Sequence, residues 1–268
     1  MSSIILLLAA GLSAAAEATP AAGRCWWLVA SSDAIVYGRV ITTGNSTPQA
    51  TSTLTLRPEQ WLKRVGTARP DAITVVNRRG GGTAIGRPLT ASLETLGSES
   101  TYDVTPEMEP SCPSLWESPQ PVSELLDEVA RQARLMAEFP GIAERVRRTK
   151  IHGVVRRDIE ALVRAKPEDK TARVQRLVSR GMDAVPAMIA LLDDDRSVPE
   201  GSIEVRVRRS FESTAHYSPT TVFEVVDLVL GQLTDVRFGM ADGNDIVRKR
   251  ILDAWRIYLA YGCPKAAE

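Results

Sequence analysis

Glu212 and His216 are the residues best suited to acid–base chemistry, because they stand four positions apart. If this segment turned helically, the carboxylate and the imidazole would share one face and could act as an acid–base pair. However, no serine or cysteine has the sequence context of an activated nucleophile, and no nucleophile-elbow motif occurs. A histidine close to a Ser-Pro dipeptide more often holds a loop through hydrogen bonds than transfers protons. We therefore favour a structural role for His216 over a catalytic one.

Three consecutive carboxylates, Asp193–Asp195, stand at the end of a predicted helix over residues 182–196. Negative charge is unfavourable there, because the helix dipole is already negative at its C-terminus. Positive charges must offset it, and the candidates are Arg196, Arg206 and Arg208. Calcium is the alternative, but the ligand spacing of an EF-hand is absent. We expect a structural network of aspartates and arginines, and no metal site.

The same polar segments supply the candidate binding residues. No cofactor is expected, because the glycine run at residues 80–82 lacks the spacing of a phosphate-binding loop. The candidate binding residues are Asp193, Asp194, Arg196, His216, Tyr217 and Phe238.

The composition is that of a globular protein without a dominant charge. The chain has 268 residues, which is enough for one large domain or two of ordinary size. Hydrophobic residues make up 44% and charged residues 25%. The 33 basic side chains balance the 33 acidic ones, so no overall field attracts nucleic acid or a membrane. The expected partner is therefore another protein.

The first residues are typical of a signal peptide. An apolar run over residues 4–16 leads into two small-x-small sites that suit signal peptidase. The run is shorter than the roughly 20 apolar residues of a transmembrane helix. A buried N-terminal helix is the alternative, since no Lys or Arg precedes the run. We expect a signal peptide over residues 1–18, a mature N-terminus at Glu17 or Thr19, and a periplasmic or secreted protein.

Three cysteines follow the predicted signal peptide: Cys25, Cys112 and Cys263. In an oxidising compartment an odd number allows one bridge and leaves one free thiol. No pair has CxxC spacing and the chain has only two histidines, so a zinc site is not expected. Cys25 and Cys112 lie near the two ends of the predicted β domain, which favours their pairing. A Cys112–Cys263 bridge remains the alternative.

The hydrophobic pattern predicts an α+β protein in two parts. Alternating residues predict a small β domain over residues 25–104, and five prolines predict an extended linker over residues 105–121. From residue 122 to 268 the pattern is helical. A first helix from Ser123 should end at Pro140. Residues 203–207 alternate like a strand and predict an extended excursion or a short hairpin arm.

The N-terminal part resembles netrin and tissue-inhibitor-of-metalloproteinase modules. The matching residues are Cys25, Ser32-Asp33-Ala34, Val36–Val40 and Trp61-Leu62-Lys63, over about 55 positions. This resemblance implies an OB-like barrel. The later cysteine and the final strand of that pattern are not found between Ala84 and Val104.

The C-terminal part resembles uncharacterised exported bacterial proteins with HEAT-like repeats. The resemblance covers about 85 residues and implies a HEAT-like helical domain without an established activity. It departs from the pattern at Asp235, where a glycine is usual. The matching residues are Ala184–Arg196, Phe211-Glu212, His216–Pro219, Phe238-Gly239 and Trp255–Leu259.

These observations favour an exported, non-enzymatic protein that binds or scaffolds another protein. The alternative is a hydrolase that uses Glu212, His216 and the Asp193–Asp195 run. A weaker alternative is a protease inhibitor that acts through Cys25 at a mature N-terminus, which would require cleavage directly before that residue.

Overall fold

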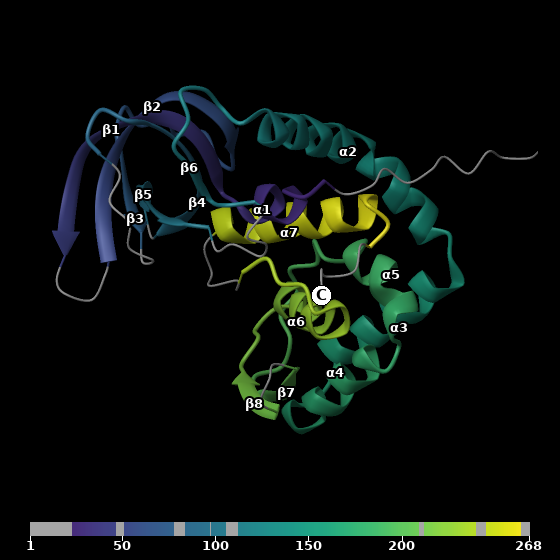
Figure 1. The fold of residues 1–268 in the computed structure, drawn as a ribbon. Coiled ribbons are helices and arrows are strands. Elements are labelled where there is room, and N and C mark those ends of the chain that lie inside the picture. Colours follow the sequence, from purple (N-terminus) through teal and green to yellow (C-terminus); the bar gives the residue numbers. More distant parts are fainter. Residues whose placement is uncertain are drawn as a thin grey trace, which may run out of the picture.

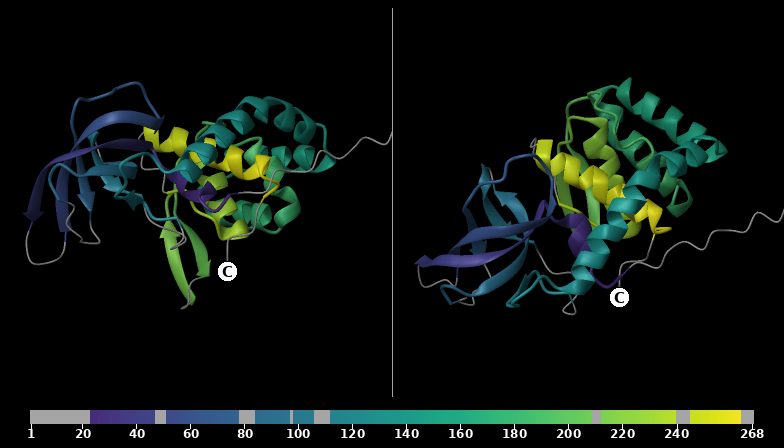
Figure 2. Two further views of the ribbon diagram at one scale, coloured as in Figure 1. Left: turned by 45° about the horizontal axis from the view of Figure 1, so that its top comes forward. Right: turned by 90° about the horizontal axis from the view of Figure 1, so that it is seen from above.

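The computed structural model describes residues 23–46, 51–77, 84–96, 98–105, 112–208, 212–239 and 245–263. A β-barrel forms one end of the molecule and a group of helices forms the other (Figure 1). The views in Figure 2 show the same division. The fold is therefore α+β, as the sequence predicts.

Five strands build the barrel, in the order β1-β2-β3-β5-β4, and β1 also pairs with β4 to close it. β3 and β5 run parallel, while the other neighbours run antiparallel. This arrangement fits an OB-like barrel. The strands are β1 (Ala34–Ser46), β2 (Thr51–Arg64), β3 (Ile73–Asn77), β4 (Pro88–Leu96) and β5 (Ser98–Val104).

Alternating apolar side chains fill the barrel, as the period of two in the sequence predicts. β1 and β2 approach most closely at Gly38. A Cβ atom there would lie 2.2 Å from the carbonyl oxygen of Arg57, so this irregular pairing requires glycine. The core includes Val36, Val40, Leu54, Leu56, Ile73, Val75, Leu89, Leu93 and Tyr102.

The helices surround a second, larger core. Trp255 is fully buried at its centre, with ring centroids 4.9 Å from Phe238 and 5.4 Å from Tyr258. Two 3₁₀ turns, Pro167–Asp169 and Met182–Ala184, join the shorter helices. The helices are α2 (Ser123–Arg147), α3 (Lys150–Val163), α4 (Lys170–Val178), α5 (Val185–Ile189), α6 (Val222–Thr234) and α7 (Asp245–Ala260).

The predicted break at Pro140 is wrong, because α2 continues through it to Arg147. Proline inside a helix removes one backbone hydrogen bond and costs about 3 kcal/mol. Leu135, Phe139 and Ala143 nevertheless lie four residues apart on one buried face. Burial of this face on both sides of the proline offsets the local cost.

The predicted helix over residues 182–196 is also wrong in length, because α5 ends at Ile189. The backbone beyond it bonds to the first residues of α6 instead. Phe223 donates its N–H to the carbonyl of Asp194, and Val222 donates to that of Arg196. These bonds are made between distant segments, so the helical periodicity of Val185–Leu192 could not reveal them.

The segment before α6 forms an antiparallel hairpin of β7 (Ile203–Arg208) and β8 (Glu212–Tyr217), in agreement with the predicted hairpin arm. Thr221 is the N-cap of α6, and Glu224 completes a capping box with it.

The proline-rich stretch that was expected to be an extended linker contacts the barrel. Its described part contains β6 (Leu115–Trp116), which pairs with β4. Ser92 also donates its backbone N–H to the carbonyl of Ser114. Proline density excludes long ladders, but it leaves room for this two-residue pairing.

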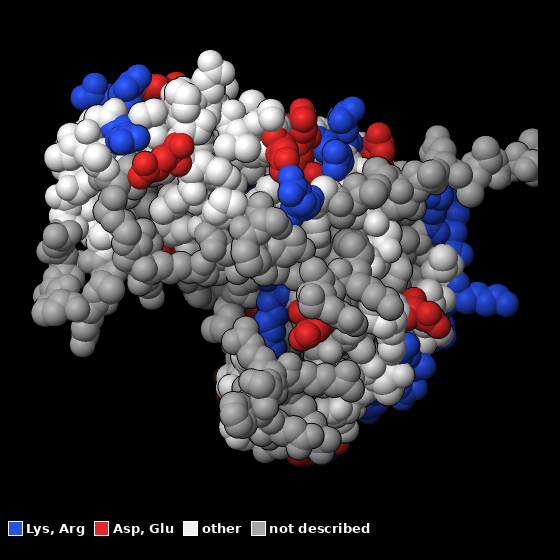
Figure 3. Space-filling model, in the orientation of Figure 1, with Lys and Arg blue, Asp and Glu red and all other residues white. Residues whose placement is uncertain are grey.

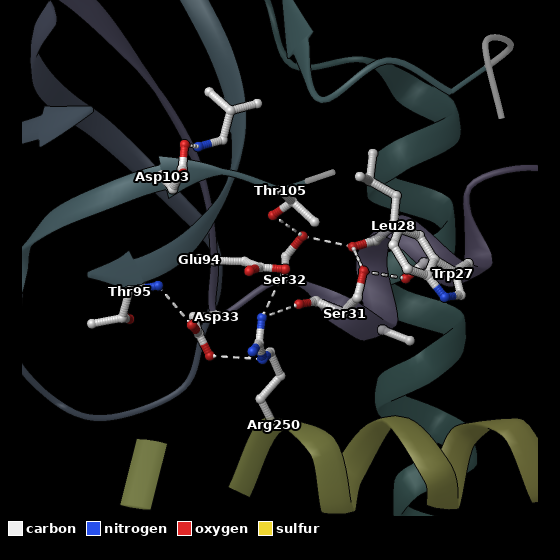
Figure 4. A network of polar contacts seen from close by, with 12 residues as sticks. Trp27, Leu28, Ser31, Ser32, Asp33, Glu94, Thr95, Asp103, Thr105 and Arg250 are labelled. Atoms are coloured by element: carbon white, nitrogen blue, oxygen red, sulfur yellow. Dashed lines mark hydrogen bonds and ion pairs between the residues drawn. The ribbon is translucent and has the colours of Figure 1, made fainter. Parts of the chain in front are cut away.

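The short helix α1 (Trp26–Ser31) and a buried ion-pair network join the barrel to the helices. Arg250 of α7 is only 3% exposed and lies 3.3 Å from Asp33 and 3.0 Å from Glu94, both at the barrel edge (Figure 4). It also donates a 2.7 Å hydrogen bond to the carbonyl of Ser31. Trp26, which the sequence assigns to the β domain, packs in the helical core.

A disulfide joins Cys25 to Cys112, with their Cα atoms 5.4 Å apart. This is the pairing favoured from the sequence, and Cys263 is a free thiol. None of the described helices is long and apolar enough to cross a membrane.

Candidate functional site

Glu212 and His216 both lie on β8, so the helical turn required for their acid–base pair is not present. Residues four apart in a strand are separated by about 13 Å, compared with about 6 Å in a helix. The side chain of His216 is exposed, and no hydrogen bond to it is found among the described residues. The side chain of Glu212 lies outside the described residues.

We expect His216→Ala to change the free energy of unfolding by less than about 0.5 kcal/mol, because an exposed side chain without a described partner contributes little. Urea denaturation of the two proteins measures this difference. A loss of 1 kcal/mol or more would restore the structural role that the sequence favoured.

The three carboxylates at residues 193–195 form a network with arginines, but largely with different ones from those expected. Asp194 binds Arg196 through several short contacts, including one of 2.6 Å. Asp195 pairs with Arg248, and Asp193 lies 3.9 Å from Arg256. Both of these arginines belong to α7, about fifty residues further along the chain. The side chains of the other two candidates, Arg206 and Arg208, lie outside the described residues.

A groove of about 380 Å³ opens beside this network. Asp193, Asp194 and Arg196 line it, so three of the candidate binding residues lie together. Arg196 spans the groove by pairing with Glu160 of α3 at 2.9 Å. Its hydrogen bonds also lower the pKa of Asp194 below the usual range, which keeps that carboxylate charged. Apolar floor residues and a further arginine complete the lining: Ile159, Leu191 and Arg156.

The exposed face of α3 continues the groove and is strongly basic. Between residues 131 and 180 the chain has fourteen Lys and Arg and six Asp and Glu, a net charge of +8 (14 − 6) in a protein whose total is zero. Figure 3 shows basic side chains along the edge where Figure 1 places α3 and the end of α2. On α3 and the last turns of α2, four exposed basic side chains have no ion pair in the part of the chain that the structure describes. These four are Arg145, Lys150, Arg156 and Arg157.

The remaining candidate binding residues do not line this groove. Tyr217 lines a second pocket, of about 230 Å³, next to the exposed His216. Phe238 is buried in the core and cannot contact a ligand directly.

Sequence reasoning missed Asp227 and Arg237, which also line this second pocket. Asp227 lies off the apolar stripe that Val222, Val225 and Val229 form on α6. A charged residue is ordinary there, so no signal in the sequence marked it. Arg237 carried no signal either, since it lies in a segment without periodicity.

No protein-family model matches this chain, and a search of curated proteins finds no relative.

Proposed function

We propose that this protein is an exported, non-enzymatic binding module that holds an acidic protein against α3 and the adjoining groove. The observation that carries the proposal is the charge segregation on this face. Four exposed basic side chains have no acidic partner among the described residues, next to a groove that already contains an ordered Asp194–Arg196–Glu160 network.

Several features favour a protein over other polyanions. The groove contains both charge signs and an apolar floor of Ile159 and Leu191, a mixture that is common in protein interfaces. A nucleic acid or an anionic membrane would meet the carboxylates of Asp193 and Asp194 at the same place. The zero net charge of the chain also gives no long-range attraction to such polymers.

The architecture proposed for this surface is HEAT-like. The helix α3 packs against both α4 and α5, and stacking of consecutive helices is how helical repeats expose one continuous face for binding. Export is part of the same proposal. The Cys25–Cys112 bridge is compatible with an oxidising compartment.

The two alternatives have less support. A hydrolase would need Glu212 and His216 close together, but they occupy distant positions of one strand. A protease inhibitor would need Cys25 at a free N-terminus. Intact-mass analysis of the secreted protein measures that terminus directly.

The binding proposal predicts that charge reversal on α3 abolishes capture of the partner. We expect Lys150→Glu/Arg156→Glu/Arg157→Glu, used as bait for the periplasmic or secreted fraction of the native host, to lose a protein that the wild type retains. Retention should weaken as salt rises from 50 to 300 mM, because exposed charges are screened.

The matched control reverses three exposed arginines on the barrel, in Arg57→Glu/Arg69→Glu/Arg87→Glu. This bait has the same net charge as the α3 variant and should keep the partner. Equal losses in both variants would show that the overall charge, and not α3, determines capture.

A further inference from the structure

The pocket beside Tyr217 lies between the end of β8, the first turns of α6 and the segment that follows α6. Its volume of about 230 Å³ is below the range of most drug-sized ligand sites. Ser218, at its rim, is exposed, so a solute can enter from solvent. The size limits the ligand to a small molecule.

Asp227 supplies the negative charge of this pocket. Trp255 donates its indole N–H to one carboxylate oxygen at 2.6 Å. The second oxygen has no hydrogen-bond partner among the described residues. Burial raises the pKa of Asp227 to about 6, although the Trp255 hydrogen bond and the charge of Arg237 both oppose this shift. The carboxylate is therefore charged at neutral pH.

Arg237 supplies a positive charge close by. Its side chain crosses α6 at Gly231. A Cβ atom added to Gly231 would lie 3.4 Å from the Cγ atom of Arg237. Gly231 is one helical turn after Asp227, so the two charged groups are neighbours. One guanidinium nitrogen contacts the hydroxyl of Tyr217 at 3.3 Å, and no other bond of this guanidinium is found within the described ranges.

Glu224, the other carboxylate of the pocket, is already engaged. Its Oε2 atom accepts the backbone N–H of Thr220 at 2.5 Å and completes the capping box of α6. The pocket thus presents one available anion and one available cation, beside an apolar wall that includes Leu228.

We infer that this pocket binds a free α-amino acid with an apolar side chain. The ammonium group pairs with Asp227, the carboxylate pairs with Arg237 and Tyr217, and the side chain packs against Leu228. An amino acid carries an ammonium and a carboxylate group bonded to one carbon atom, which matches the neighbouring carboxylate of Asp227 and guanidinium of Arg237. This site is independent of the α3 face, so either proposal can fail without the other.

Three related probes test the inference by isothermal titration calorimetry at pH 7.5. L-leucine carries both charges, L-leucinamide lacks the carboxylate, and N-acetyl-L-leucine lacks the ammonium group. We expect saturable binding of L-leucine and at least about tenfold weaker binding of the other two, since each loses a charge-assisted hydrogen bond. Equal binding of L-leucinamide, equal binding of N-acetyl-L-leucine, or no binding of L-leucine would each overturn the inference.

Asp227→Asn and Arg237→Gln should each weaken L-leucine binding by at least about tenfold. Asparagine keeps an oxygen for the Trp255 hydrogen bond, and circular dichroism can verify that each variant is folded. The matched control is Asp235→Asn, the same change at an exposed residue after α6, and it should bind like the wild type. Undiminished binding in Asp227→Asn would contradict the assignment.

The affinity of the wild type should also fall between pH 7 and pH 5, as Asp227 becomes protonated. The other groups that face it are Arg237, Tyr217, Trp255 and Glu224. Asp227→Asn should lack this pH dependence.

Discussion

Replacing Arg250 with methionine is expected to lower the free energy of unfolding by about 3–5 kcal/mol. The guanidinium is buried and is the cation shared by Asp33 and Glu94. Without it, Asp33 and Glu94 remain at the junction and have lost their shared ion-pair partner. Burial already raises the pKa of Glu94, and Arg250 opposes that shift. Guanidinium denaturation followed by circular dichroism measures the change.

Lys249 provides the matched control, because it is the preceding residue of the same helix. It is exposed, and among the described residues its ion-pair partner is Asp253, at 2.9 Å and one turn further on. We expect Lys249→Met to cost less than about 0.5 kcal/mol. If Arg250→Met were no more destabilising than Lys249→Met, the junction network would not stabilise the fold.

The double variant Asp33→Asn/Arg250→Met should be more stable than Arg250→Met alone, because it removes one of the unmatched charges. A double-mutant cycle on these two residues then gives their coupling energy.

Removing the disulfide is expected to have an equally large effect. Cys25→Ala/Cys112→Ala opens a loop whose ends are 87 residues apart. The chain-entropy model gives a loss of about 4–5 kcal/mol for a loop of this length. Guanidinium denaturation without reductant measures it.

Dithiothreitol offers an independent check on the same prediction. It should destabilise the wild type to a similar extent and leave the double variant unchanged. Cys263→Ala should change the free energy of unfolding by less than about 1 kcal/mol, because this half-buried thiol forms no bridge. A much larger loss of unfolding free energy in Cys263→Ala, measured without reductant, would mean that the cysteines pair differently in solution.

Much of the local structure could be predicted from the sequence. Alternation identified β1, the β7–β8 hairpin arm and the small β domain, because a strand with one buried face must repeat every two residues. The positions of Cys25 and Cys112 near the ends of that domain indicated their pairing. These predictions succeed because each depends on neighbouring residues or on a simple count.

The errors arise where distant segments decide the outcome. α2 passes through Pro140 because both of its halves bury one face, and α5 stops early because residues 194–198 bond to residues 220–223. The partners of Asp193 and Asp195 come from α7 for the same reason. The pocket of Asp227 and Arg237 needs the hairpin end, α6 and the segment after α6 to be placed together, so no single stretch of sequence contained it.

The hydrogen bond from Arg250 to Ser31 joins residues 219 positions apart, so it cannot form until most of the chain has been synthesised. At a translation rate of about 5–20 residues per second, roughly 10–45 s pass between the appearance of the two residues. During that interval Asp33 and Glu94 lack the guanidinium of Arg250. Contacts of such long range also slow folding, because a large loop must close first. The junction between the barrel edge and the helices is therefore completed only after α7 has been synthesised.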